Sequence, residues 1–194
     1  MRSRTVRTVI ALLLTLVLCA GLFNGAAFAA ESKATREDVY KAARKTIDYY
    51  QKTFRQREYK GILDWPALGL FGFGEDVSGP RWTVNGKNGA YWREQEVRQG
   101  IGLSKTKNTD FQRTIIGVCA AGKDPRNFGG LNLVEIVKGT MLPSGHFADS
   151  VADNKTGQPV GEDLVNAHIF GIIALHCAGE PIPNKDKCLE WLEK

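Results

Sequence analysis

The sequence has few of the residues that usually carry chemistry. Its 194 residues include only 3 histidines and 4 cysteines. The His-Glu-x-x-His, Gly-x-Ser-x-Gly and Walker-loop motifs are all missing. No subset of the potential metal ligands has the close spacing of a zinc site; these ligands are Asp110, Cys119, His146, Asp149, His168 and Cys177. The sequence therefore predicts no metal, no cofactor and no catalytic residue.

Outside the N-terminal segment, the chain also lacks a large excess of positive or negative charge. The whole chain has 26 Lys and Arg against 21 Asp and Glu, a formal net charge of +5. Residues 1–30 hold three of these basic residues (Arg2, Arg4 and Arg7) and no acidic one, so 23 basic residues face 21 acidic ones, a net charge of +2, in the remainder. Because the two signs are interspersed, as on a solvated surface, the pattern argues against a nucleic-acid partner.

The long apolar run of the chain lies near its N-terminus. Residues 9–23 are apolar, follow the basic start, and precede Ala27-Phe28-Ala29. This pattern predicts a secretory signal at residues 1–30, cleaved after Ala29 or Ala30. A retained anchor is the alternative, but the run of about 15 residues is shorter than the roughly 20 that a span needs. We expect a secreted or cell-surface protein that does not span the membrane after cleavage, with one domain at residues 31–194.

Removal of the signal leaves Cys119, Cys177 and Cys188, an odd number too small for a disulfide framework. In an exported protein, Cys177 and Cys188 flank a turn and are a possible disulfide between neighbouring helices. The alternative is that these cysteines are small buried residues of helices.

An internal repeat organises the rest of the chain. The segment ALGLFGFGED at 67–76 overlays IIGVCAAGKD at 115–124 with a shift of 48, and IIALHCAGE at 172–180 overlays it with a shift of 57. Each copy is apolar nearly all round and ends at a glycine suited to a left-handed C-cap, which predicts buried helices. Three copies about 50 residues apart indicate a repeat architecture.

One-faced segments alternate with these inner helices. Apolar residues at three- and four-residue steps predict outer helices at 35–54, 90–100, 131–141 and 186–194. Thr109 and Gln112 have the spacing of a capping box at the start of the middle inner helix. The Gly- and Asn-rich loops at 78–89, 102–108 and 142–163 are where ligand contacts usually lie on helical scaffolds.

Four stretches carry a resemblance to a known superfamily: DWPALGLFGFGED, TDFQRTIIGVCAAGKDPRNFGG, LPSGHFAD and VNAHIFGIIAL. They resemble the α/α-toroids, which include terpene cyclases, protein prenyltransferase β-subunits and transcobalamin-type carriers. They are more similar still to exported bacterial proteins with prenyltransferase and squalene-oxidase-like repeats. The resemblance implies an all-α fold in which outer helices wrap parallel inner ones. About three helix pairs make a partial α/α-toroid, completed by missing C-terminal sequence, a homodimer or a second chain.

The chemistry of the enzymes in that superfamily is not matched. The Asp-x-Asp-Asp acid of the cyclases is absent, and the prenyltransferase zinc ligands are not in place. The resemblance therefore implies an exported, non-catalytic binding or scaffold module for an unknown small molecule or cell-surface partner, with a partial or degenerate isoprenoid enzyme as the alternative. The candidate cavity residues, for which simple packing is the alternative, are Trp65, Phe111, Arg113, His146 and His168.

Overall fold

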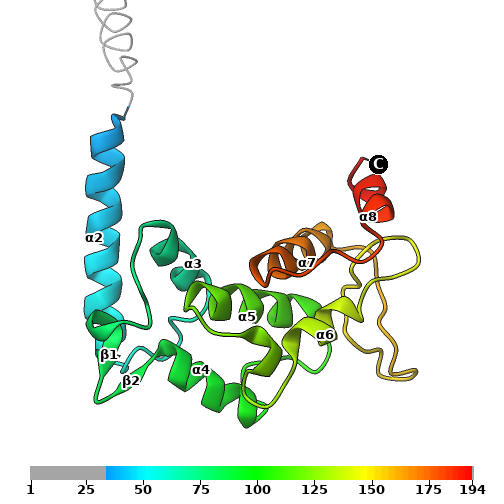
Figure 1. The fold of residues 1–194 in the computed structure, drawn as a ribbon, viewed down its shortest axis with the longest axis horizontal. Coiled ribbons are helices and arrows are strands. Elements are labelled where there is room, and N and C mark those ends of the chain that lie inside the picture. The colour runs from blue at the N-terminus through cyan, green and yellow to red at the C-terminus, as the bar shows by residue number, and fades with distance from the viewer. Residues whose placement is uncertain (1–33, 194) are drawn as a thin grey trace, which may run out of the picture. The chain divides into compact units, whose positions relative to one another are not determined.

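The computed structural model describes residues 34–193, so the expected signal at 1–30 lies outside the described residues. Seven α-helices dominate this range, which confirms the mostly helical prediction (Figure 1). They are α2 (Arg36–Arg55), α3 (Trp65–Gly72), α4 (Gly89–Arg98), α5 (Asn108–Ala120), α6 (Leu133–Lys138), α7 (Val165–Cys177) and α8 (Lys185–Leu192). Strands β1 (Thr83–Val84) and β2 (Lys87–Asn88) form one small hairpin with Thr83 opposite Asn88.

The described residues belong to two compact units, which divide between residues 45 and 46. In the first unit, Thr35 and Asp38 form a reciprocal cap at the start of α2: Asp38 Oδ2 accepts the Thr35 N–H at 2.9 Å, and Thr35 Oγ1 accepts the Asp38 N–H at 3.2 Å. All the remaining elements belong to the second unit. No helix within residues 34–193 combines the length and the apolar character that crossing a bilayer requires.

Helices α3, α5 and α7 lie parallel, with α5 in the middle. At their N-terminal ends, Arg113 of α5 pairs with Asp64 before α3 at 3.2 Å, and Gln112 Nε2 donates to the Ala167 carbonyl of α7 at 2.8 Å. At their C-terminal ends, the Ser78 hydroxyl donates to the Ala121 carbonyl at 2.7 Å. Like ends are therefore adjacent in both neighbouring pairs.

The predicted repeat is confirmed at the C-terminal ends of these three helices. Gly74, Gly122 and Gly179 have φ values of 78°, 65° and 70°, the left-handed region that favours glycine. Each is followed by a residue whose N–H donates to the carbonyl five residues back, at 3.0, 3.0 and 2.9 Å. This is the Schellman arrangement, which satisfies backbone carbonyls that the helix leaves unpaired.

The loops after α3 and α5 repeat the same contacts. Asp76 Oδ1 accepts the Ser78 N–H at 2.9 Å, and Asp124 Oδ1 accepts the Arg126 N–H at 3.0 Å. Ser78 and Arg126 each lie four residues beyond their C-cap glycine. Each donates a side-chain hydrogen bond to the carbonyl of the last residue before the glycine of the next helix: Ser78 to Ala121, and Arg126 to Ala178 at 2.7 Å. The loops thus join successive helices in the same way.

The side chains of Asn88 and Asn132 begin the outer helices α4 and α6. Asn88 Oδ1 accepts the Tyr91 N–H at 3.0 Å, and Asn132 Oδ1 accepts the Glu135 N–H at 3.1 Å. These are N-caps, which satisfy backbone donors in the first helical turn. Helix α6 packs against both α5 and α7, and α4 packs against β2.

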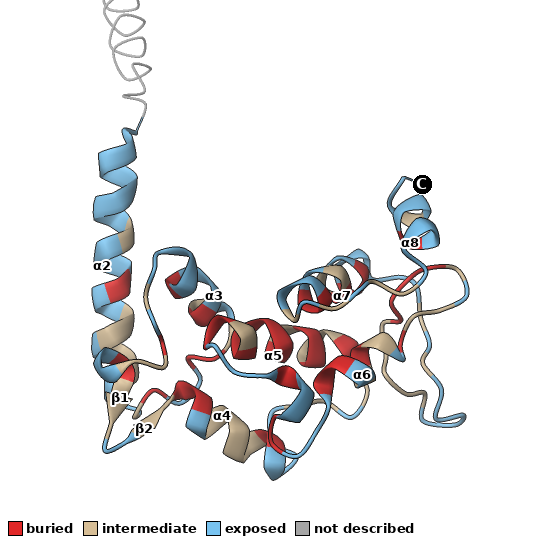
Figure 2. Ribbon diagram, in the orientation of Figure 1, coloured by how far each residue is buried: buried red, intermediate tan, exposed pale blue. Residues whose placement is uncertain are grey.

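Burial is concentrated on α5 (Figure 2). Its side chains contact both neighbouring inner helices, and a Cβ built at Gly117 would lie 3.1 Å from the backbone of Leu63. Helices α3 and α7 differ from the prediction of inner helices buried all round. Each is buried on one side and exposes apolar side chains on the other, because each has an inner-helix neighbour on only one side.

The predicted capping box of α5 is wrong. The helix begins at Asn108, its N-cap Lys107 makes no side-chain cap, and Gln112 is fully buried with its amide on the Ala167 carbonyl. Asn108 Nδ2 likewise donates to Thr140 Oγ1 at 2.8 Å. Long-range hydrogen bonds therefore use the polar side chains that the local pattern assigned to the helix end.

The long loop at 142–163 is tied to the start of α7. Ser150 and Val160 form an isolated antiparallel bridge. The Asp149 carboxylate accepts the N–H groups of Asp163 and Leu164 at 3.0 and 3.1 Å. These bonds set the direction in which the chain enters α7.

Candidate functional site

A partly exposed surface with two aromatic rings and one arginine spans the N-terminal halves of the three parallel helices. Trp65 begins α3 and is 44 % exposed, and its ring centroid lies 4.9 Å from that of Phe170 on α7. Trp65, Arg113 and Phe170 each lie nine residues before a C-cap glycine, so they occupy equivalent positions of the repeat. Leu68, one turn beyond Trp65, is also exposed. We call Trp65, Leu68, Arg113 and Phe170 the inner face.

The charge of the inner face is already compensated. Arg113 Nε lies 3.2 Å from Asp64 Oδ1, and its terminal nitrogen lies 3.3 Å from Asp110 Oδ1. The other Asp110 oxygen accepts the Ser104 N–H at 3.0 Å. Because two carboxylates surround one guanidinium, the inner face offers no uncompensated positive charge to an anionic group such as a diphosphate.

Three of the predicted cavity residues lie away from the inner face. Phe111 belongs to the core of the second unit. The rings of His146 and His168 stack at 4.9 Å with an angle of 12°, and the Trp191 ring lies 4.3 and 4.7 Å from them. Both histidines are fully buried, so they cannot line an open cavity.

The two buried histidines differ in their hydrogen bonds. His168 Nδ1 accepts the Phe147 N–H at 3.3 Å, and its Nε2 lies 3.1 Å from the Cys188 carbonyl. Neither ring nitrogen of His146 makes a well-aligned hydrogen bond within the described residues, although the backbone of Leu164 and of Phe147 lies close enough to favour its charged form slightly. Burial lowers the pKa of both rings, because a charged imidazolium loses its hydration inside the protein.

The cysteines of the predicted disulfide are not brought together in the structure, where all three described cysteines are free thiols. Cys188 is buried, with its sulfur 3.7 Å from Nε2 of His168 in the first turn of α7. Cys177 is the last residue of α7. Nine residues of helix separate His168 from Cys177, a rise of about 13 Å, so the two thiols lie near opposite ends of α7.

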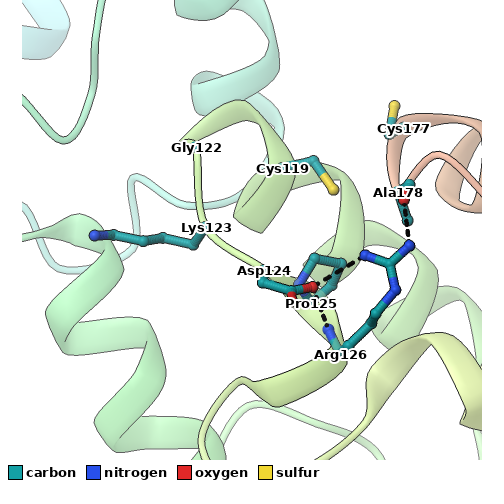
Figure 3. Close-up of a pocket in the computed structure, with 8 residues that line it drawn as sticks. All are labelled: Cys119, Gly122, Lys123, Asp124, Pro125, Arg126, Cys177 and Ala178. Carbon is teal, nitrogen blue, oxygen red and sulfur yellow. Dashed lines mark hydrogen bonds and ion pairs between the residues drawn. The ribbon is translucent and has the colours of Figure 1, made fainter.

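Cys177 instead lines a surface pocket of about 330 Å³ together with Cys119 of α5 (Figure 3). The Arg126 guanidinium crosses the pocket to the end of α7, with Glu180 Oε1 at 2.6 Å and Asp124 Oδ1 at 3.1 Å. The hydrogen bond from Arg126 lowers the pKa of Glu180. Burial raises the pKa of the Cys119 thiol to about 11, with a further contribution from Cys177.

We expect Cys177 to react with maleimides much faster than Cys119 or Cys188. Cys177 is exposed, Cys188 is buried, and Cys119 carries little thiolate at pH 8 because its pKa is about 11. The rate at Cys119 should rise about tenfold per pH unit from pH 8 to pH 10. Mass spectrometry of peptides after timed labelling measures each site. Equal rates at Cys119 and Cys177 at pH 8 would contradict this order, and urea-unfolded protein is the control.

Phe170 and Trp191 were missing from the residues predicted from sequence. The repeat held a signal for Phe170, because this residue has the same distance to its C-cap glycine as Trp65. Trp191 had no such signal, since only the fold brings α8 against His146 and His168. Among residues 34–193, no group of three or more His, Cys, Asp and Glu side chains is arranged to hold a metal ion.

Comparisons with known proteins add no relative. No protein-family model matches the chain. No curated protein and no solved structure matches it either.

Proposed function

We propose that the chain is a non-catalytic binding module that holds an apolar ligand on the inner face. The observation that carries the proposal is the contact between the exposed ring of Trp65 and the half-buried ring of Phe170, which come from two different copies of the repeat. Large aromatic rings left exposed and clustered are typical of binding surfaces. The Arg113 charge between them is compensated by carboxylates, which favours an uncharged ligand over a phosphorylated one.

The finer fold that we propose is a partial α/α-toroid. Its support is the parallel arrangement of α3, α5 and α7, the alternation with α4, α6 and α8, and the repeated C-cap contacts. Export to the cell surface or medium remains part of the proposal and rests on the sequence of residues 1–30.

Binding of the neutral dye N-phenyl-1-naphthylamine tests the inner face. We expect saturable binding to the full chain, weakened about tenfold in both Trp65→Ser and Phe170→Ser, because each substitution removes a large aromatic contact area. Dye fluorescence titrated with protein measures the dissociation constant. Tyr91→Ser is the matched control, since it removes an exposed aromatic ring on α4, outside the inner face.

Two results would count against the proposal. Unchanged dye affinity in both inner-face variants, with circular dichroism showing that they are folded, would place apolar binding elsewhere. Conversion of farnesyl diphosphate to a new product, detected by mass spectrometry, would favour an isoprenoid enzyme instead.

A further inference from the structure

The row formed by α3, α5 and α7 has two edges that no other inner helix covers. On α7, aliphatic side chains four residues apart are exposed, by 53 %, 39 % and 36 %; they are Val165, Ile169 and Ile173, which we call the α7 edge. On α3, Gly69 and Gly72 are exposed, and a Cβ built at either meets nothing within 4 Å. We call these two glycines the α3 edge.

The α7 edge repeats the side by which α5 contacts α7. Counted back from the C-cap glycines, Ile169 and Ile173 correspond to Gln112 and Ile116 of α5. Both α5 residues are buried, and Gln112 donates its hydrogen bond to α7. Ile169 therefore occupies a repeat position that, on α5, is covered by the next inner helix. The counterpart of Ile173 on α3 is Leu68, which is exposed although α5 follows α3, so Ile169 carries the correspondence on α7.

The α3 edge repeats the opposite side. Gly69 corresponds to Gly117 of α5, which lies close to the backbone of Leu63 at the start of the preceding helix. It also corresponds to Ala174 of α7, which is fully buried. Gly69 of the α3 edge therefore occupies the position that, on α5, meets the segment at the start of the preceding inner helix. The counterparts of Gly72 are Ala120, which is buried, and Cys177, which is exposed, so Gly69 carries the correspondence on α3.

From this correspondence we infer that the α7 edge of one copy binds the α3 edge of a second copy of the chain. The contact continues the α5–α7 interface from one molecule into the next. Aliphatic side chains of α7 lie against glycines of α3, where the absence of Cβ atoms allows close approach. Helix α3 has no charged residue, and α7 has none besides its two histidines, so the contact desolvates little charge. Such head-to-tail contact is heterologous, since different surfaces of the two copies meet.

Disulfide trapping tests which edges meet. Two differently tagged full chains, both carrying Cys19→Ser, Cys119→Ala and Cys177→Ser, receive Gly69→Cys and Ile169→Cys respectively, and are mixed and oxidised with diamide; the remaining Cys188 is buried. We expect a cross-linked product that carries both tags on a non-reducing gel. A copy with Lys155→Cys, in the exposed part of the 142–163 loop, is the control and should not cross-link to Ile169→Cys.

Two outcomes of the disulfide trapping would contradict the inferred contact between the α7 edge and the α3 edge. Cross-linking of Ile169→Cys to itself, without the mixed product, means that two α7 edges meet and overturns the head-to-tail contact. Absence of any cross-linked product overturns it too, provided that circular dichroism shows folded variants. Gly72→Cys serves as a second α3-edge variant in case Gly69→Cys does not fold.

Sedimentation equilibrium measures the association independently. We expect the full chain to have a mass above that of one copy, and Ile169→Asp to return it to the mass of one copy, because a carboxylate would be desolvated in the contact. Ile101→Asp makes the same change at an exposed isoleucine outside both edges and should leave the mass unchanged. A one-copy mass for the unsubstituted chain at its highest soluble concentration contradicts the inference. A variant that loses dye binding without a change in mass tests the binding role of the inner face and not the association of two copies.

Discussion

Replacing Gly171 with alanine is expected to lower the free energy of unfolding by about 1–3 kcal/mol. Alanine is the better helix former by roughly 1 kcal/mol, so the helix itself favours the substitution. The opposing effect is steric, because a Cβ at this position would lie 2.5 Å from the Phe147 ring. Phe147 is fully buried and its N–H is bonded to His168, so the ring cannot move without disturbing that contact.

The matched control for this substitution is Gly69→Ala. Gly69 is also helical, but a Cβ there meets nothing within 4 Å, so alanine should raise the free energy of unfolding by up to about 1 kcal/mol. Urea unfolding of dilute protein, followed by circular dichroism, compares the two. If Gly171→Ala were as stable as Gly69→Ala, the close packing of Phe147 against α7 would be refuted.

Lowering the pH below 6.5 is expected to destabilise the fold through His146 and His168. Burial lowers the pKa of both rings below the usual value of 6.5, against smaller raising effects of Asp149 and Glu162 on His146 and of the Cys188 carbonyl on His168. The nearby His146 ring further lowers the pKa of His168. Below pH 6.5 the unfolded chain therefore takes up protons that the folded chain does not.

The sign of the effect follows from this difference in bound protons. Above pH 6.5 both rings are neutral in the folded and in the unfolded chain, so they do not make the free energy of unfolding depend on pH. Below it, each histidine reduces the free energy of unfolding by up to about 1.4 kcal/mol per pH unit, until the lower pKa of the folded state is reached. Urea unfolding at pH 7.5, 6.5 and 5.5 measures the slope.

Substituting each histidine with phenylalanine separates the two rings. His146→Phe should raise the free energy of unfolding at pH 7.5 by about 1 kcal/mol, because it removes buried nitrogens that make no well-aligned hydrogen bond, and should reduce the acid slope. His168→Phe should lower it by about 1–3 kcal/mol, because the Phe147 N–H and the Cys188 carbonyl lose their partner. An unchanged acid slope in both variants would show that other groups cause the pH dependence.

The sequence predicted the helices better than their environments. The spacing of Gly74, Gly122 and Gly179 could be recognised in the sequence, because a left-handed C-cap requires glycine at a fixed position after each helix. The same pattern could not show that α3 and α7 each expose one side. An apolar helix has the same sequence pattern whether it packs between two inner helices or against only one. Burial of α5 depends on contacts with residues 40 and 55 positions away in the sequence.

The candidate site was predicted in part. Arg113 of α5 pairs with Asp64, which directly precedes Trp65 in the chain, because α3 and α5 run parallel. A role for Trp65 and Arg113 in ligand binding stays a prediction. His146 and His168 were predicted to line a cavity but are covered by Trp191, and no local pattern joins α8 to the 142–163 loop. The possible disulfide was inferred because Cys177 and Cys188 are close in sequence. In the structure Cys188 lies near the start of α7 and Cys177 lies at its end, so the length of α7 separates the two thiols.

The hydrogen bonds of Ser78 to Ala121 and of Arg126 to Ala178 have a consequence for how such a chain lengthens. Both donors belong to the loop of one repeat, and both acceptors are main-chain atoms of the next, so the acceptor exists whatever side chain stands there. An in-frame genetic duplication of residues 75–122, inserted after Gly122, would pair the new Ser78 with the new Ala121 and leave Arg126 facing Ala178. Each boundary would keep a donor and an acceptor at its usual spacing. Growth by whole units therefore preserves these contacts, whereas gain or loss of a few residues within a loop breaks them.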